Sequence, residues 1–173
     1  MSGILLKSAS DPATCCEPLL KWPGGKRRLV QIILRLVPQD LGRYYEPFFG
    51  GGALFFALQP RVARLSDRNA ELISAYLQIR NHPEDVIRQL CKLKNSETDY
   101  YATRSSTPRI DSARAARTIY LTTLAFNGIH RVNLRGEFNV PYGRKTHLRP
   151  CEPEKIIAAS KLLKKATLFP IQT

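Results

Sequence analysis

The chain has few cysteines, no long apolar run and a shortage of acidic side chains. Four cysteines in 173 residues are too few for a disulfide-held scaffold, and we expect buried or idle thiols. No cysteine or histidine pair has a metal-ligand spacing such as Cys-x-x-Cys, so no metal site is predicted. No apolar run approaches the ~18 residues of a membrane span, and the first residues lack the apolar stretch of a secretory signal. We therefore expect a cytoplasmic chain without a membrane partner.

The shortage of acidic residues leaves the chain strongly basic. It has 27 Lys and Arg residues against 14 Asp and Glu residues, a formal net charge of +13. The excess is concentrated in residues 101–150, which carry nine basic and two acidic side chains. A basic segment attracts nucleic acid because neutralised phosphates release their counterions, but a solvated basic surface has the same composition. Charge alone leaves both readings open.

The first half of the chain predicts an α/β fold. Apolar residues from 29 to 37 recur at helical spacing, and Pro38 ends that helix. Residues 44–48 read as a short buried strand before a glycine turn, residues 53–58 as a helix and residues 62–65 as a second strand. Asn69 is placed to cap the next helix. This order predicts a βαβα start with a parallel sheet.

The second half of the chain predicts mainly helices. Helices are expected over 83–93, 111–126 and 154–163, and a last strand over 166–171. Residues 131–143 look like a hairpin that turns at 134–137. The basic excess of this half therefore falls mainly on a helix and a hairpin.

The glycine turn and the acid that follows the second strand point to a ligand site. A strand that runs through Gly50 and Gly52 into a helix presents free backbone N–H groups. Asp67, at the end of the next strand, is placed to accept two ribose hydroxyls. A tight turn with a helix-capping Asp remains the alternative.

Four motifs resemble the Dam-like (D12 class) adenine-N6 DNA methyltransferases, in that family's order and over about residues 19–170. They are Lys-Trp-Pro-Gly-Gly-Lys at 21–26, Glu-Pro-Phe-Phe-Gly-Gly-Gly at 46–52, Ser-Asp-Arg-Asn-Ala-Glu-Leu-Ile at 66–73, and the run from Asn127 to Arg144. The resemblance implies S-adenosylmethionine as methyl donor and double-stranded DNA as partner. It assigns the cofactor pocket to Trp22, Lys26, Phe48, Gly50, Gly52 and Asp67.

The resemblance also implies roles for the basic segment. The hairpin belongs to the family's DNA-recognition insert, which gives base contacts to Arg131, Asn133 and Pro141 and phosphate contacts to Arg144 and Lys145. An Arg can read guanine through O6 and N7. Phe126 and Asn127 stand where the family probes the base stack beside the flipped adenine; a core aromatic at a helix end is the alternative for Phe126. The hairpin resembles those of members that modify GATC, the expected target.

The resemblance gives the expected architecture. It is α/β: the N-terminal part of a Rossmann-like methyltransferase sheet, with an inserted, mainly helical DNA-recognition domain that contains a β-hairpin. The expected parts are a flexible arm at 1–18, the cofactor-binding half at 19–95, the recognition insert at 96–150, and a return helix and strand at 151–173.

One family element is missing. The catalytic Asp-Pro-Pro-Tyr, which accepts hydrogen bonds from the adenine amino group and stacks on its ring, does not occur in this sequence, so no catalytic residue is assigned. In the family's sheet, of order 3-2-1-4-5-7-6, the fourth strand covers the first, so residues 44–48 should be an exposed apolar edge here.

Three hypotheses follow from the missing element. The chain is a truncated methyltransferase that is inactive alone, or half of a split enzyme whose second polypeptide supplies the rest. The third is a non-catalytic DNA-binding remnant. The intact cofactor motifs favour the first two.

Overall fold

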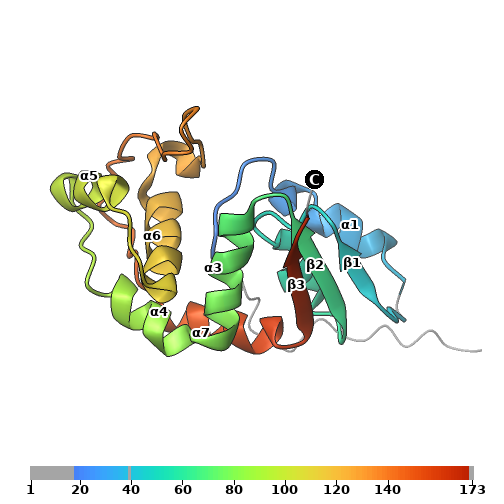
Figure 1. Ribbon diagram of the computed structural model, residues 1–173. Helices are drawn as coiled ribbons and strands as arrows, with labels where there is room; N and C mark the ends of the chain where they lie inside the picture. The colour runs from blue at the N-terminus through green and yellow to red at the C-terminus, as the bar shows by residue number, and fades with distance from the viewer. Residues whose placement is uncertain (1–17, 39, 172–173) are drawn as a thin grey trace, which may run out of the picture.

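The computed structural model describes residues 18–38 and 40–171. Residues 1–17 of the expected arm at 1–18, Cys15 and Cys16 included, lie outside the described residues. Three parallel strands form one sheet in the order β1-β2-β3, with the bounds β1 (Tyr44–Glu46), β2 (Ala63–Asp67) and β3 (Ala166–Pro170) (Figure 1). The α/β class and the parallel sheet predicted from the sequence are therefore confirmed.

Seven α-helices accompany the sheet in the described residues. They are α1 (Val30–Leu36), α2 (Ala53–Leu58), α3 (Ala70–Asn81), α4 (Pro83–Leu90), α5 (Glu97–Ser105), α6 (Asp111–Leu124) and α7 (Pro153–Leu163). The Asn69 side chain accepts a hydrogen bond from the Leu72 N–H, which confirms the expected cap of α3. Helix α5 was not expected, although Ser96 caps it in the same way.

The helices divide between two ends of the molecule (Figure 1). Helices α4, α5 and α6 gather at one end, the sheet with α1 and α2 forms the other, and α3 and α7 lie between them. A single hydrophobic core runs through both ends, with side chains from α3, α4, α6, α7 and the sheet. A separately folded insert is not shown, and the boundaries at 95 and 150 stay predictions.

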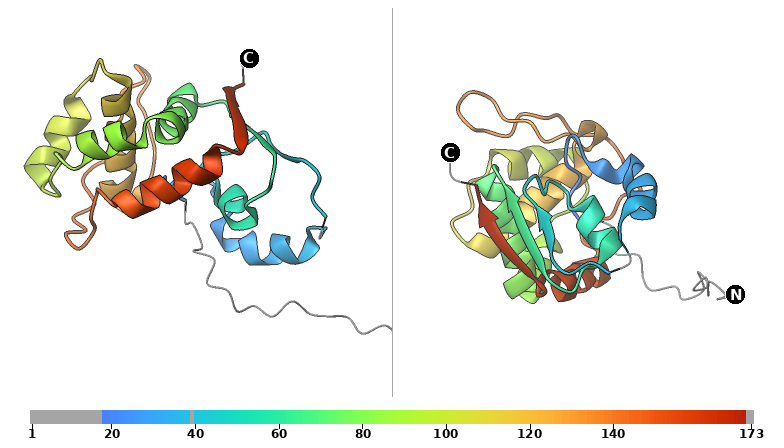
Figure 2. Two further views of the ribbon diagram at one scale, coloured as in Figure 1. Left: turned by 90° about the horizontal axis from the view of Figure 1, so that it is seen from below. Right: turned by 90° about the vertical axis from the view of Figure 1, so that its right-hand side faces the viewer.

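The sheet end exposes apolar side chains. Within residues 18–38 and 40–171, strand β1 pairs with β2 only, and Tyr45 is 57% exposed while Tyr44 and Glu46 are buried. The expected buried strand is therefore buried at alternate residues, because successive side chains point to opposite faces of the sheet and one face is open here. The stripe of α1 is also open, since Leu36 is 78% exposed. We call Leu29, Ile32, Leu36, Tyr45 and Phe48 the open end; all five are exposed, and α1 and β1 lie at the same end of the molecule (Figure 2).

A disulfide corrects one prediction from the sequence. Cys91 and Cys151, which were expected to be idle thiols, are bonded with their Cα atoms 5.3 Å apart. Sequence spacing gave no sign of this pair, because sixty positions separate the two residues and only the packing of α4 against α7 brings them together. In the described residues no helix is long and apolar enough to cross a membrane.

Candidate functional site

Aromatic side chains of the core hold the glycine turn in place. Phe49 lies in the core, and its ring centroid is 4.8 Å from that of Tyr76 on α3. The Tyr76 hydroxyl donates to the Gly51 carbonyl over 3.0 Å. Gly52 has φ +70°, and a Cβ there would lie 2.6 Å from the Phe49 ring. The turn therefore needs glycine at position 52 for both its backbone conformation and its packing.

Asp67 connects this turn to the start of α3. One carboxylate oxygen accepts the Gly50 N–H over 2.8 Å, and the other accepts the Asn69 N–H over 2.9 Å. Each oxygen keeps a free lone pair for a further donor. The acid predicted at the end of the second strand thus holds two loops together and can still accept hydroxyls.

A buried acid at the end of β1 anchors Lys26. Glu46 is 5% exposed, and its carboxylate accepts from Lys26 Nζ over 3.0 Å and from the Tyr44 hydroxyl over 2.8 Å. Lys26 Nζ also donates to the Phe48 carbonyl over 3.0 Å, which leaves one of its three N–H donors free. Burial, followed by the Glu46 charge, raises the pKa of Tyr44 well above its ordinary value. The role of Glu46 was missed, although the residue opens the second motif.

These groups surround a pocket of about 250 Å³ at the carboxyl end of β1. Its lining includes five of the six expected cofactor residues, Trp22, Lys26, Phe48, Gly50 and Gly52. Asp67 joins them through its hydrogen bond to Gly50. The structure thus brings residues of the first two motifs together around one pocket and connects Asp67 of the third motif to it; their role in cofactor binding stays a prediction.

The basic hairpin forms where it was expected. Val132 and Phe138 pair as an antiparallel bridge, and Gly136 takes φ +78° in the turn. The Asn133 side chain accepts from the N–H groups of Arg135 and Glu137 and donates to the Glu137 carboxylate. Its amide therefore shapes the turn in this state, and a base contact by Asn133 stays a prediction.

The other DNA candidates lie on the surface around this hairpin. Arg131 is exposed, and its Nε donates to Asn139 Oδ1 over 2.8 Å. Phe126 is 51% exposed, which speaks against the core-aromatic alternative. The remaining candidates keep their expected roles as predictions: Asn127 has φ +53°, Pro141 is exposed and Lys145 half-buried, and Arg144 pairs with Glu97 over 3.3 Å.

Lys21 connects the first motif to the basic segment, a role that the sequence did not reveal. A Cβ on Gly128 would lie 2.7 Å from the Lys21 side chain. Burial, and then the charges of Lys145 and Arg27, lower the pKa of Lys21 below its ordinary value. Lys21 thus adds a cation beside the loop that carries Asn127.

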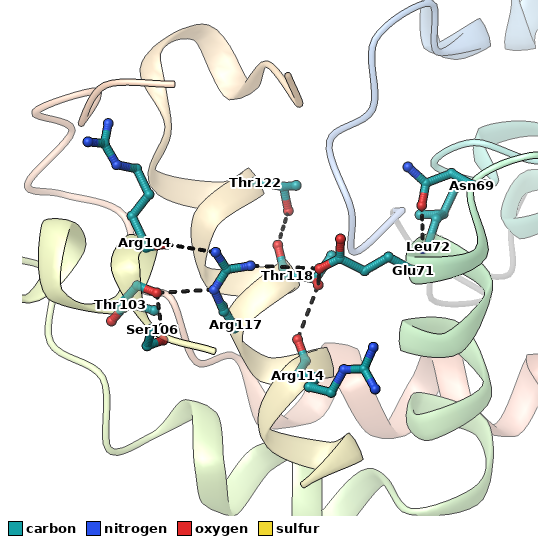
Figure 3. A network of polar contacts seen from close by, with 10 residues as sticks. All are labelled: Asn69, Glu71, Leu72, Thr103, Arg104, Ser106, Arg114, Arg117, Thr118 and Thr122. Carbon is teal, nitrogen blue, oxygen red and sulfur yellow. Dashed lines mark hydrogen bonds and ion pairs between the residues drawn. The ribbon is translucent and has the colours of Figure 1, made fainter. Parts of the chain in front are cut away.

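A polar network joins α3 to the helices of the basic segment (Figure 3). The Thr118 hydroxyl on α6 donates to Glu71 on α3 over 3.0 Å, and Arg117 lies 3.8 Å from the same carboxylate. Arg117 also donates to the carbonyls of Thr103 and Arg104 on α5. The network fixes α5 and α6 relative to the helix that begins beside Asp67.

Next to this network, α5, α6 and the hairpin enclose a larger basic hollow. It has a volume of about 760 Å³. Its charged lining consists of four arginines and two glutamates: Arg104, Arg114, Arg117, Arg135, Glu71 and Glu137.

Comparison with known proteins places these features in a family. The family model for D12 class N6 adenine-specific DNA methyltransferases matches residues 22–169. A type II methyltransferase of Lactococcus lactis subsp. cremoris, M1.LlaDCHI, is 43% identical over 85% of this chain and 55% of its own length. M.MjaIII of Methanocaldococcus jannaschii is 33% identical over 88% and 61%. A DNA adenine methylase of Salmonella typhi is 37% identical over 78% and 50%.

The match covers the four motifs except Lys21, and most of the elements described above. The chain spans half to about three fifths of the length of these relatives. It belongs to the D12 class of N6 adenine-specific DNA methyltransferases.

Proposed function

We propose that this chain supplies the cofactor-binding and DNA-reading parts of a site-specific DNA adenine methyltransferase. The donor is S-adenosylmethionine, the acceptor is adenine N6 in duplex DNA, and the target is GATC. The observation that carries the proposal is the gathering of residues from the first two motifs around the pocket at the end of β1, with Asp67 of the third motif bonded to Gly50 in its wall.

The free donors and acceptors at this pocket suit S-adenosylmethionine. The spare lone pairs of Asp67 can accept the two ribose hydroxyls, and the third N–H of Lys26 can donate to the methionine carboxylate. Trp22 offers a flat ring on the pocket wall. The cofactor, when bound, supplies a methyl carbon made electrophilic by its sulfonium. The chain's own residues bind and orient it.

The hairpin and its neighbours supply the DNA-reading surface. Arg131 is exposed beside the hairpin, where a guanidinium can pair with guanine. Phe126 and Asn127 lie on the loop that follows α6, where they can probe the stack beside a flipped adenine. The positive charge of residues 101–150 provides the attraction to phosphates that all such binding needs.

We propose further that the transfer step needs an Asp-Pro-Pro-Tyr element, which these 173 residues do not contain. Among the described residues the second edge of β1 is unpaired, and a strand carrying Asp-Pro-Pro-Tyr would pair with it. Alone, the chain should bind but not methylate. The relatives named type II methyltransferases favour a DNA-associated role in restriction and modification.

Methyl transfer to DNA tests this proposal. Labelled S-adenosylmethionine and a GATC duplex would be incubated with the chain, with and without the part of the Lactococcus lactis relative that the chain does not match. A duplex with GTAC in place of GATC is the matched control. We expect no label with the chain alone and label in the GATC duplex when both polypeptides are present.

The other outcomes separate the hypotheses. Transfer by the chain alone would refute the need for an added Asp-Pro-Pro-Tyr segment. No transfer in either mixture, together with DNA binding that ignores S-adenosylhomocysteine, would identify a DNA-binding remnant. Equal labelling of both duplexes would refute the target.

A further inference from the structure

His130 lies between the candidate cofactor pocket and the hairpin, and the four motifs give it no role of its own. Its imidazole stacks on the Trp22 indole, with ring centroids 4.3 Å apart and an angle of 27° between the planes. The imidazole also makes an edge contact with the Phe138 ring, with centroids 5.5 Å apart and an angle of 69° between the planes. Trp22, His130 and Phe138, which we call the aromatic bridge, therefore connect the first motif to the hairpin.

Each end of the aromatic bridge belongs to a different site. Trp22 lines the cofactor pocket, and a Cβ on Gly50 would lie 3.2 Å from its ring. Phe138 is a buried residue of the hairpin and pairs with Val132. His130 directly precedes Arg131, the candidate base reader. A shift of the indole would thus move the residue next to the DNA-reading arginine.

The side chains around His130 leave its imidazole little space to move. The imidazole borders a very small cavity, about 10 Å³, whose lining also includes Glu71, Arg117 and Thr118. These three residues are tied to one another by the network of Figure 3. The imidazole is therefore held between a fixed polar cluster and the Trp22 ring, with little space to move.

We propose that His130 is a positioning residue that couples occupancy of the cofactor pocket to DNA binding through the aromatic bridge. The Trp22 loop contains Pro23-Gly24-Gly25, and glycine has a large entropic cost of ordering. Whichever ligand binds first orders this loop, and the closely held ring stack passes that ordering to the hairpin, so the second ligand meets a smaller cost. This coupling rests on the proposed function, since it requires both ligands to bind.

The test compares DNA affinity with and without a cofactor probe. The dissociation constant for a GATC duplex would be measured at zero and at saturating S-adenosylhomocysteine. Coupled sites differ by about fivefold or more, and we expect this for the wild type. His130→Ala should reduce the ratio to about one while the affinity for DNA alone changes little. His130→Phe, which keeps a ring for stacking, should retain the ratio.

Tryptophan fluorescence gives a second readout, because Trp22 is the single Trp of the chain. DNA binding should change the Trp22 emission in the wild type and in His130→Phe, but not in His130→Ala. His147→Ala is the matched control, since it removes an exposed histidine of the same basic segment and should leave both readouts unchanged.

Three results would overturn the inference. They are an unchanged ratio in His130→Ala, an uncoupled wild type that binds both ligands, and loss of coupling in His130→Phe with folding intact. If the wild type binds neither probe, the proposed function fails and the inference fails with it. The separate binding curves distinguish that case from the other three.

Discussion

The backbone N–H of Gly50 donates to the Asp67 carboxylate over 2.8 Å, so the glycine turn after β1 and the acid after β2 form one unit. The two residues come from different motifs. Their bond means that a change at either position acts on the fold and on the pocket together.

Replacing Asp67 by Ala should abolish cofactor binding and weaken the fold. The substitution leaves the N–H groups of Gly50 and Asn69 without their acceptor, at a cost of about 1–3 kcal/mol in unfolding free energy. Calorimetric titration with S-adenosylhomocysteine and urea unfolding measure the two effects. Retention on heparin should stay nearly unchanged, and equal loss of both binding activities would refute the pocket assignment. Asp40→Ala, at an exposed position, is the control.

Lys26 and Glu46 should show strong coupling in a double-mutant cycle. Lys26→Met leaves the buried Glu46 carboxylate with the Tyr44 hydroxyl as its remaining side-chain partner. We expect a loss of about 1–3 kcal/mol, below the usual figure for a buried pair because Lys26 is 37% exposed. Adding Glu46→Gln should restore part of the stability. Additive losses in urea unfolding would show that the pair contributes no more than its separate contacts.

Arg131→Ala should reduce discrimination between DNA sequences. A bidentate contact to guanine contributes about 1–3 kcal/mol of specificity. Binding to GATC should therefore weaken much more than binding to a scrambled duplex. Arg109→Ala, also exposed, should lower both affinities slightly. Uniform weakening by Arg131→Ala, with a smaller salt slope, would make Arg131 a phosphate contact.

The elements of the fold were predictable where local signals were strong. The helix at 53–58 follows from Gly52 before it and Pro60 after it, and Asn69 marks the start of α3. Helix α5 was missed because residues 97–105 have no clear apolar stripe, and only Tyr100 and Thr103 are buried. Exact ends also differ: α4 ends at Leu90 instead of residue 93.

The site was predictable only as a set of separate motifs. Sequence order placed Trp22, Gly50 and Asp67 in one family pattern, but it gave no sign of their contacts. The Lys26 amine reaches the buried Glu46 carboxylate across the fold, and the stacking of Trp22 on His130 joins positions far apart in the chain. Such pairings depend on tertiary packing, and the hydrophobic periodicity of the sequence indicates only local structure.

Reducing the Cys91–Cys151 disulfide should destabilise the chain. The bond closes a loop with a sequence separation of 60, and a cross-link over such a loop contributes about 2–4 kcal/mol. Thermal unfolding with and without a phosphine reductant measures this, and the midpoint should fall on reduction. Cys151→Ser should unfold at the lower midpoint in both buffers. A wild-type midpoint that ignores the reductant would show that the thiols are not bonded in solution.

Acidification should destabilise the chain through His130. Burial lowers the pKa of His130 below its ordinary value; Glu71 opposes this and Arg117 adds to it. As pH falls through about 6.5, the His130 imidazole is protonated in the unfolded chain while it stays neutral in the folded chain. The free energy of unfolding therefore declines. The free energy of urea unfolding from pH 7.5 to 5.5 should therefore fall more steeply for the wild type than for His130→Phe. Parallel curves would contradict the lowered pKa.

The strand order has a consequence for the shape of the cofactor pocket. In open parallel sheets, ligands occupy the crevice at the point where successive strands reverse their direction of travel across the sheet. From β1 to β3 the strands step one way only, so a reversal requires a strand on the free side of β1. The pocket at the end of β1 is thus half of a crevice, and its second wall belongs to whatever strand completes the sheet there.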